Sequence, residues 1–153
     1  ASHRIAALWR LHAVHHSAKH MDWLAGSRQH IFEVLITRTM VLAPIYVMGF
    51  SKEVIDAYIV IVGFQAVFNH ANVSARLGPL RYLIVTPNFH HWHHSQDQEA
   101  LDKNYAAHLA FLDYLFGTAV KSDRTWPTHY GVLGDYVPQG FVAQFKFPFN
   151  WKG

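Results

Sequence analysis

The sequence predicts an all-α protein, and two observations lead to that prediction. Two nearly continuous apolar runs flank a short polar turn, and the grouping His-x-x-His-His occurs twice at helical spacing. The chain has 153 residues, which suits one domain with a substantial core. Only 15% of the residues are charged, below the usual quarter of a soluble globular protein. An unusually apolar helical domain is therefore expected.

The ionisable residues exclude several kinds of site. The 13 histidines equal the lysines and arginines together, whereas the absence of cysteine excludes disulfides and thiolate metal sites. The net charge of +3 is not gathered in a dense Lys/Arg run, so no nucleic-acid partner is predicted. The first ten residues carry Arg4 and Arg10 and do not resemble a secretory signal.

The first elements follow from the periodicity. Apolar residues at helical spacing predict a helix over residues 5–16, and residues 22–27 predict a break. A hairpin of two apolar helices is then expected at about 33–68. Ser51 is a candidate N-cap of its second helix, with Glu53 early in that helix.

The charges around this hairpin favour a membrane location. Each apolar run is shorter than the ~20 residues that cross a bilayer squarely, so buried helices of a soluble bundle are the alternative. Arg38, inside the hairpin, is costly in lipid unless it reaches the interface or a partner. Basic residues nevertheless flank both ends of the hairpin, as in a hairpin that enters from the cytoplasmic side. These flanking residues are Arg4, Arg10, Lys19, Arg28, Arg76 and Arg81.

The second half of the chain is predicted to be more broken. Pro87 suits the first turn of a helix that carries the second histidine grouping. A short helix is expected over 106–116, ending at Gly117. Residues 1–118 are thus expected to form the domain. The Pro-, Gly- and aromatic-rich residues 119–153 are expected to be a tail that packs on the domain or on the membrane surface.

The histidine groupings predict a metal site. Positions i, i+3 and i+4 of a helix share one face. Crowded imidazoles could not all be protonated, and neutral imidazoles buried together would lack hydrogen-bond partners; bound metal resolves both problems. His70, at the end of the hairpin, and His3 are placed to join the six histidines of the two groupings. The predicted ligands are His3, His12, His15, His16, His70, His90, His93 and His94.

Eight ligands suit two metal ions better than one, because a structural zinc takes four. Imidazole binds iron, zinc, copper and nickel, so the ligand type alone leaves the metal open. The sequence contains neither the His-Glu-x-x-His of zinc proteases nor the Glu-x-x-His pairs of carboxylate-bridged di-iron bundles. His20, His91, His108 and His129 stand outside the repeated spacing and are predicted to be core or surface residues.

Four stretches resemble one known family. They are LWRLHAVHHS at 8–17, TPNFHHWHH at 86–94, Asn104-Tyr105, and LDYLFGT at 112–118. Together they resemble the fatty acid hydroxylase superfamily, in its bacterial sterol-desaturase-like branch, from about Ser2 to Thr118.

This resemblance implies an all-helical, multi-pass membrane oxygenase, here of a bacterial inner membrane. Its histidine cage would hold two iron ions, with zinc as a possible substitute, on the cytoplasmic side. Such an enzyme uses O2 and electrons from a separate donor, such as a cytochrome b5-type protein or a ferredoxin and its reductase. It hydroxylates or desaturates a C–H bond of a sterol or fatty acyl lipid.

The resemblance also assigns roles by matching position. His70 falls, together with Asn72, on the family's histidine at the exit of the hairpin. His3 matches the second member of a first box, His-x-x-x-His, whose first member would precede Ala1. Upstream membrane helices and at least one ligand are therefore expected to be missing from this chain, which would then bind metal incompletely. Arg28 and His30 resemble an Arg-x-His element and are expected beside the ligands or the substrate.

Groups that orient the rings are expected behind the ligands. The candidates are the carboxylates of Asp22, Asp97, Asp102 and Asp113, of which Asp113 is preferred. The alternative function is a histidine-rich membrane protein that binds zinc without catalysis. A metal-dependent hydrolase is disfavoured, because no glutamate stands in either histidine grouping to act as a general base.

Overall fold

The computed structural model describes residues 2–120, 125–134 and 136–150, and its regular structure is helical. The one β-type contact in these ranges is an isolated antiparallel bridge between Ser95 and Tyr130. The all-α prediction is therefore confirmed. The α-helices are α1 (Ala6–His16), α2 (Ile31–Val47), α3 (Lys52–His70), α4 (Pro87–His93), α5 (Phe111–Leu115) and α6 (Phe141–Lys146). Short 3-10 turns are η1 (Ala25–Ser27), η2 (Gly78–Tyr82), η3 (Gln98–Ala100) and η4 (Phe147–Phe149).

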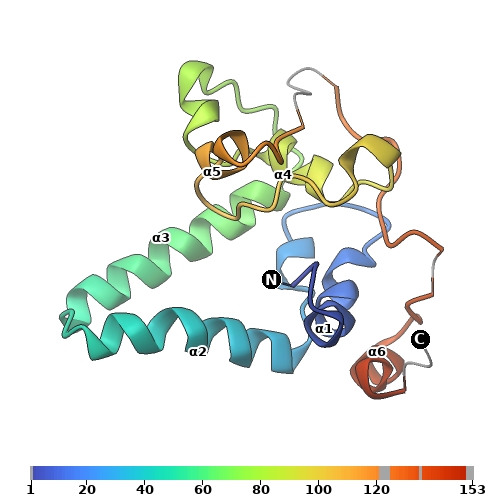
Figure 1. Cartoon of the computed structure of the whole chain (residues 1–153), viewed down its shortest axis with the longest axis horizontal. Helices are drawn as coiled ribbons and strands as arrows, with labels where there is room; N and C mark the ends of the chain where they lie inside the picture. Colours follow the sequence, from blue (N-terminus) through green and yellow to red (C-terminus); the bar gives the residue numbers. More distant parts are fainter. Residues whose placement is uncertain (1, 121–124, 135, 151–153) are drawn as a thin grey trace.

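Helices α2 and α3 form the predicted hairpin. They meet at a tight turn, where Gly49 adopts a positive φ of 78°, and diverge toward the rest of the chain (Figure 1). Ser51 occupies the N-cap position of α3, but its side chain accepts no backbone hydrogen bond there. Its hydroxyl instead bonds to Glu53, which lowers the pKa of that carboxyl.

The hairpin exposes most of its apolar side chains. Glu33 is the buried residue of α2, and only Val62, Asn69 and His70 are buried in α3. Val47 and Phe64 are 82% and 74% exposed. These helices therefore present an apolar surface instead of filling a core.

No helix within the described ranges is both long enough and apolar enough to span a membrane. The predicted transmembrane helix is thus not found. The helix lengths and composition explain the difference, because α2 has 17 residues. Helix α3 has 19, but it opens with the charged residues Lys52, Glu53 and Asp56.

Helices α1 and α4 pack between the open end of the hairpin and the C-terminal segment. Thr86 caps α4 by accepting a hydrogen bond from the backbone N–H of Phe89 (3.2 Å), and Pro87 occupies the first turn, as predicted. The apolar clusters around these helices are small. The largest fully buried side chains include His91, His94 and Asn104. The centre of the molecule is therefore polar.

The carboxylate of Asp113 holds the loop that precedes α5. This carboxylate accepts hydrogen bonds from the backbone N–H groups of Tyr105 (2.9 Å) and Ala106 (2.7 Å) and from the Thr118 hydroxyl. These bonds keep the backbone before α5 non-helical. The helix predicted from residue 106 consequently begins only at Phe111, although it ends before Gly117 as expected.

The described part of the C-terminal segment packs on the domain. Phe147 contacts the cluster of Ala13, Val132 and Val137, which holds this segment against α1. The backbone carbonyl of Phe145 bonds to His30 Nε2 at 3.0 Å, at the start of α2.

Candidate metal centre

The structure brings together all eight histidines that the sequence predicts as ligands. They form two groups of four, and within each group one nitrogen from each ring lies within 4.8 Å of the others. Group 1 consists of His3, His12, His16 and His93, and group 2 of His15, His70, His90 and His94.

Each histidine grouping is divided between the two clusters. Helix α1 gives His12 and His16 to group 1 and His15 to group 2. Helix α4 gives His93 to group 1, whereas His90 and its C-cap residue His94 join group 2. The groups adjoin, since the rings of His16 and His94 stack with their centroids 4.3 Å apart. The repeated spacing predicted the six histidines of the two helices, and position along the chain predicted His3 and His70, but neither predicted this division.

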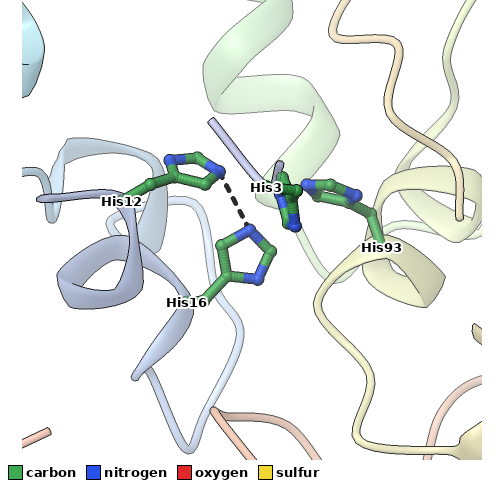
Figure 2. A group of neighbouring side chains, drawn as sticks. All are labelled: His3, His12, His16 and His93. Carbon is green, nitrogen blue, oxygen red and sulfur yellow. Dashed lines mark hydrogen bonds between the residues drawn. The ribbon is translucent and has the colours of Figure 1, made fainter. Parts of the chain in front are cut away.

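Group 1 is drawn in Figure 2. His12 and His16 extend from one helix and His93 from the opposite one, with His3 between them. The Nε2 atoms of His12 and His16 are 3.1 Å apart. The His3 ring centroid lies 4.7 Å from those of both His16 and His93. Four rings from three segments of the chain thus face one small space.

Group 2 lies deeper, and its four residues are all buried. Its Nε2 atoms form a chain of close contacts. The separations are 3.3 Å for His15 and His70, 3.1 Å for His70 and His90, and 3.2 Å for His90 and His94. The Nδ1 atoms of His90 and His94 are buried with no hydrogen-bond partner.

Backbone carbonyls fix which nitrogen of several rings carries hydrogen. Nδ1 of His15 bonds to the carbonyl of Arg28 (3.1 Å), and Nδ1 of His70 bonds to that of Ala66 (2.7 Å). A carbonyl only accepts hydrogen bonds, so each Nδ1 is the donor and each neutral ring has a bare lone pair at Nε2. Those two lone pairs face each other across 3.3 Å. A cation between them removes the repulsion, so the residues of group 2 fit a metal.

Burial keeps these rings neutral. It lowers the pKa of His15, His16, His90 and His94 well below the ordinary value, and neighbouring imidazoles lower it further. Burial also lowers the pKa of His93 to about 4 and that of His3 to about 2. Neutral imidazole is the form that binds a metal.

Glu33 is a site residue that the sequence analysis missed. Its Oε1 lies 2.5 Å from Nδ1 of His12, and its Oε2 is buried without a hydrogen-bond partner. Glu33 is only 6% exposed, at the start of the otherwise apolar hairpin. An acidic residue in that position was the available signal, but nothing in the local spacing connects it to His12.

The predicted orienting residues lie nearby in different roles. Asp113 holds the loop described above, and its charge raises the pKa of His93 against the lowering effect of burial. Asn72 donates to the carbonyl of Met21 at 2.7 Å. His30 caps α2 by accepting from Phe32 N–H. No hydrogen bond joins Asn72 or His30 to the eight rings within the described residues.

Other aspartates and histidines considered in the sequence also form specific contacts in the structure. Asp102 lies 4.0 Å from Nδ1 of His3, whereas Asp22 accepts from the backbone N–H of Leu24. His91 bonds to the Tyr130 hydroxyl and to the carbonyl of His70. It therefore supports the backbone of group 2 instead of joining it.

Eight mostly buried imidazoles in two adjoining groups, carried by helices beside an apolar hairpin, define a histidine-rich protein with a candidate metal centre. The profile of the fatty acid hydroxylase family matches residues 1–118. The chain therefore belongs to the fatty acid hydroxylase family.

Individual relatives agree with this membership. The chain is 34% identical to the ornithine lipid hydroxylase OlsE of Rhizobium tropici over 99% of its own length and 47% of that protein. It is 29% identical to the alkylglycerol monooxygenase of Homo sapiens, covering 76% of the chain and 26% of the relative. It is 28% identical to the very-long-chain aldehyde decarbonylase GL1-4 of Oryza sativa subsp. indica, covering 74% and 19%. The chain thus spans less than half the length of each of these relatives. No solved structure matches it.

Proposed function

We propose that this chain forms the metal-binding part of a membrane oxygenase that uses O2 and external electrons to hydroxylate a lipid. The observation that carries the proposal is the pair of adjoining four-histidine groups, in which lone pairs of neutral rings face one another. Family membership supports an oxidoreductase that acts on lipids. Two relatives bear the names of a lipid hydroxylase and a monooxygenase, which favours hydroxylation over desaturation.

Group 1 and group 2 would each hold one iron ion, with zinc as a possible inert substitute. Imidazole ligands suit iron, and bound iron would supply the redox chemistry: with two external electrons and two protons, one oxygen atom of O2 would enter a C–H bond and the other would leave as water. The role of this chain would be to hold the ions and to orient their ligands. Carbonyls of Arg28, Ala66 and Lys103 do so by fixing the Nδ1 hydrogens of His15, His70 and His93.

Glu33 has a distinct role in this arrangement. Its carboxylate is a buried charged group in direct contact with a ring of group 1, through Nδ1 of His12. A carboxylate behind a histidine makes the opposite nitrogen a stronger ligand and holds the ring in one orientation. Glu33 therefore acts as a positioning residue for His12.

Two cavities suit a lipid beside this centre. A cavity of about 210 Å³ between α1 and α2 is lined mainly by apolar side chains, with Glu33 at its wall. A second cavity, of about 250 Å³, is lined by rings of both groups. Ser2 borders both cavities. An alkyl chain in the first cavity would thus be directed toward the rings. The apolar lining residues are Leu8, Leu11, Ile36, Met40 and Val41.

The hairpin supplies the proposed membrane contact. Its exposed apolar surface would lie in the lipid, and the basic residues at both of its ends would place the metal centre on the cytoplasmic side. A fatty acyl or alkyl lipid suits this apolar cavity of about 210 Å³ better than the bulkier, rigid ring system of a sterol. The electron donor is proposed to be a separate protein, as the resemblance to the fatty acid hydroxylase superfamily implies.

The function is tested with the full-length protein, purified, loaded with iron and given a chemical reductant and a membrane lipid extract. Mass spectrometry under 18O2 should detect lipid species that have gained one labelled oxygen atom. His93→Ala should abolish the labelled product, whereas His129→Ala, at an exposed histidine, should not. If the purified protein contains zinc at full occupancy, and if iron loading produces no labelled lipid, the protein would instead be a non-catalytic zinc-binding protein.

A further inference from the structure

A polar cavity of about 650 Å³ lies beside the start of α4, apart from the two histidine groups. The segment after α3, the turn η2, the start of α4 and Trp126 form its walls. None of the eight histidines lines it. Its polar and aromatic lining residues are Ser74, Arg76, Arg81, Thr86, Asn88 and Trp126.

Two guanidinium groups give this cavity its chemistry. No carboxylate is present among the described residues that line it. Arg81 Nη2 donates to the Tyr82 hydroxyl (2.8 Å), and its guanidinium carbon lies 4.8 Å from the centre of the Tyr82 ring. Tyr82 therefore holds Arg81 in place, and the exposed Arg76 lines the same cavity. Guanidinium groups recognise phosphate through paired, charge-assisted hydrogen bonds.

The part of the wall that contains Asn88 and Trp126 is fixed by hydrogen bonds to one carbonyl. Asn88 Nδ2 and Trp92 Nε1 both donate to the carbonyl of Thr125, at 2.7 and 3.0 Å. The neighbouring Trp126 ring packs edge-on against His91, with centroids 4.7 Å apart. Thr86 accepts a backbone hydrogen bond and keeps its own O–H as a donor. Hydrogen bonds and ring packing thus hold Asn88 and Trp126 in place along this part of the wall.

Apolar side chains border the cationic wall. Leu80, Tyr82 and Leu83 flank Arg81 in the sequence and are all exposed. A free inorganic anion would make no favourable contact with these apolar side chains. A lipid has both an anionic headgroup and alkyl chains that could contact them. The segment also follows the hairpin directly, where headgroups would lie if the hairpin enters the membrane.

We propose that this cavity binds the phosphate group of an anionic membrane lipid. Arg76 and Arg81 contact the phosphate, and Leu80 and Leu83 contact the first part of its alkyl chains. The site is separate from the metal centre, and binding requires no turnover. The lipid holds the base of the hairpin and the start of α4 together at the membrane surface.

The test measures binding to the full-length protein in a neutral detergent at constant ionic strength. The probes are dihexanoyl phosphatidylglycerol, dihexanoyl phosphatidylcholine and inorganic phosphate, compared by titration calorimetry. Phosphatidylglycerol should bind most tightly. Arg76→Gln and Arg81→Gln should each weaken it about tenfold, the value of one lost charge-assisted bond. Lys146→Gln, which removes an exposed cation from the distant α6, should leave it unchanged (Figure 1).

Several results would overturn the proposal. Equal affinity for inorganic phosphate would assign the cavity to a free anion, and equal affinity for phosphatidylcholine would exclude selection of anionic lipids. Unchanged phosphatidylglycerol affinity in Arg76→Gln would show that the lipid does not bind in this cavity. Arg76 is exposed, so Arg76→Gln tests the proposal even if Arg81→Gln fails to fold. An unchanged metal content of Arg76→Gln verifies that this variant is folded.

Discussion

The carboxylate of Glu33 lies 2.5 Å from Nδ1 of His12 and connects the hairpin to the histidine groups. This contact joins the first turn of α2 to the middle of α1, 21 residues earlier in the chain. Through it, the apolar cavity along α2 and the rings of group 1 share one side chain.

Glu33→Gln should weaken metal binding in group 1. The amide cannot supply the negative charge that strengthens His12 as a ligand, so metal affinity should fall by about 10- to 100-fold. Competition with a calibrated chelator measures this change. Glu53→Gln, at the exposed start of α3, is the matched control and should bind metal as the native protein does. Native affinity in Glu33→Gln would show that the contact has no part in metal binding.

The two histidine groups should lose metal separately. His93→Ala removes a ring from group 1 only, and His90→Ala removes one from group 2 only, so each variant should retain about one ion where the native protein holds two. Metal analysis of each purified variant gives the number directly. His129→Ala should retain both ions. Loss of all metal from either single variant, with the helical content unchanged, would mean that the two groups do not bind independently.

Asp113→Asn should destabilise the fold without removing a ligand. The carboxylate accepts two backbone hydrogen bonds and one from Thr118, and an amide can replace these acceptors only in part. The loss should be about 2–4 kcal/mol, seen as a lower melting temperature by circular dichroism. Asp56→Asn, at an exposed ion pair with Lys52, should change stability by less than about 0.5 kcal/mol. Similar melting temperatures for the two variants would contradict this role of Asp113.

Acid should destabilise the metal-free protein. Burial lowers the pKa of His93 in the folded state to about 4, whereas the unfolded chain titrates near 6.5. Between these values the unfolded state binds more protons, so stability is fully present above pH 6.5 and falls as the pH drops toward 4. Chemical denaturation across this range checks the slope, and His93→Ala should make it shallower. A native stability that does not change from pH 7 to pH 4 would contradict the burial of neutral rings.

The sequence predicted which histidines gather better than it predicted their surroundings. Helical spacing placed His12, His15 and His16 together, because that periodicity depends only on the backbone. Their division between two groups depends on the relative orientation of α1 and α4. Local residue spacing gives no information about that orientation. The contact of Glu33 with His12 likewise arises from tertiary packing.

The loop around Asp113 illustrates the same limit. The residues from Ala106 onward suit a helix by composition, but the carboxylate of Asp113 accepts the backbone N–H groups of Tyr105 and Ala106, and the helix begins only at Phe111. The sequence predicted both ends of the hairpin to within two residues, because its apolar runs extend over many consecutive residues. Its lack of a helix able to span a membrane follows from the short α2 and the charged start of α3.

The number and environment of bound metal ions test the proposed centre most directly. Metal analysis combined with X-ray absorption on the iron-loaded, full-length protein should find two iron ions per chain, each surrounded mainly by imidazole nitrogens. A single ion per chain at saturation, or iron coordinated without imidazole, would contradict the assignment of the eight histidines to a two-metal centre.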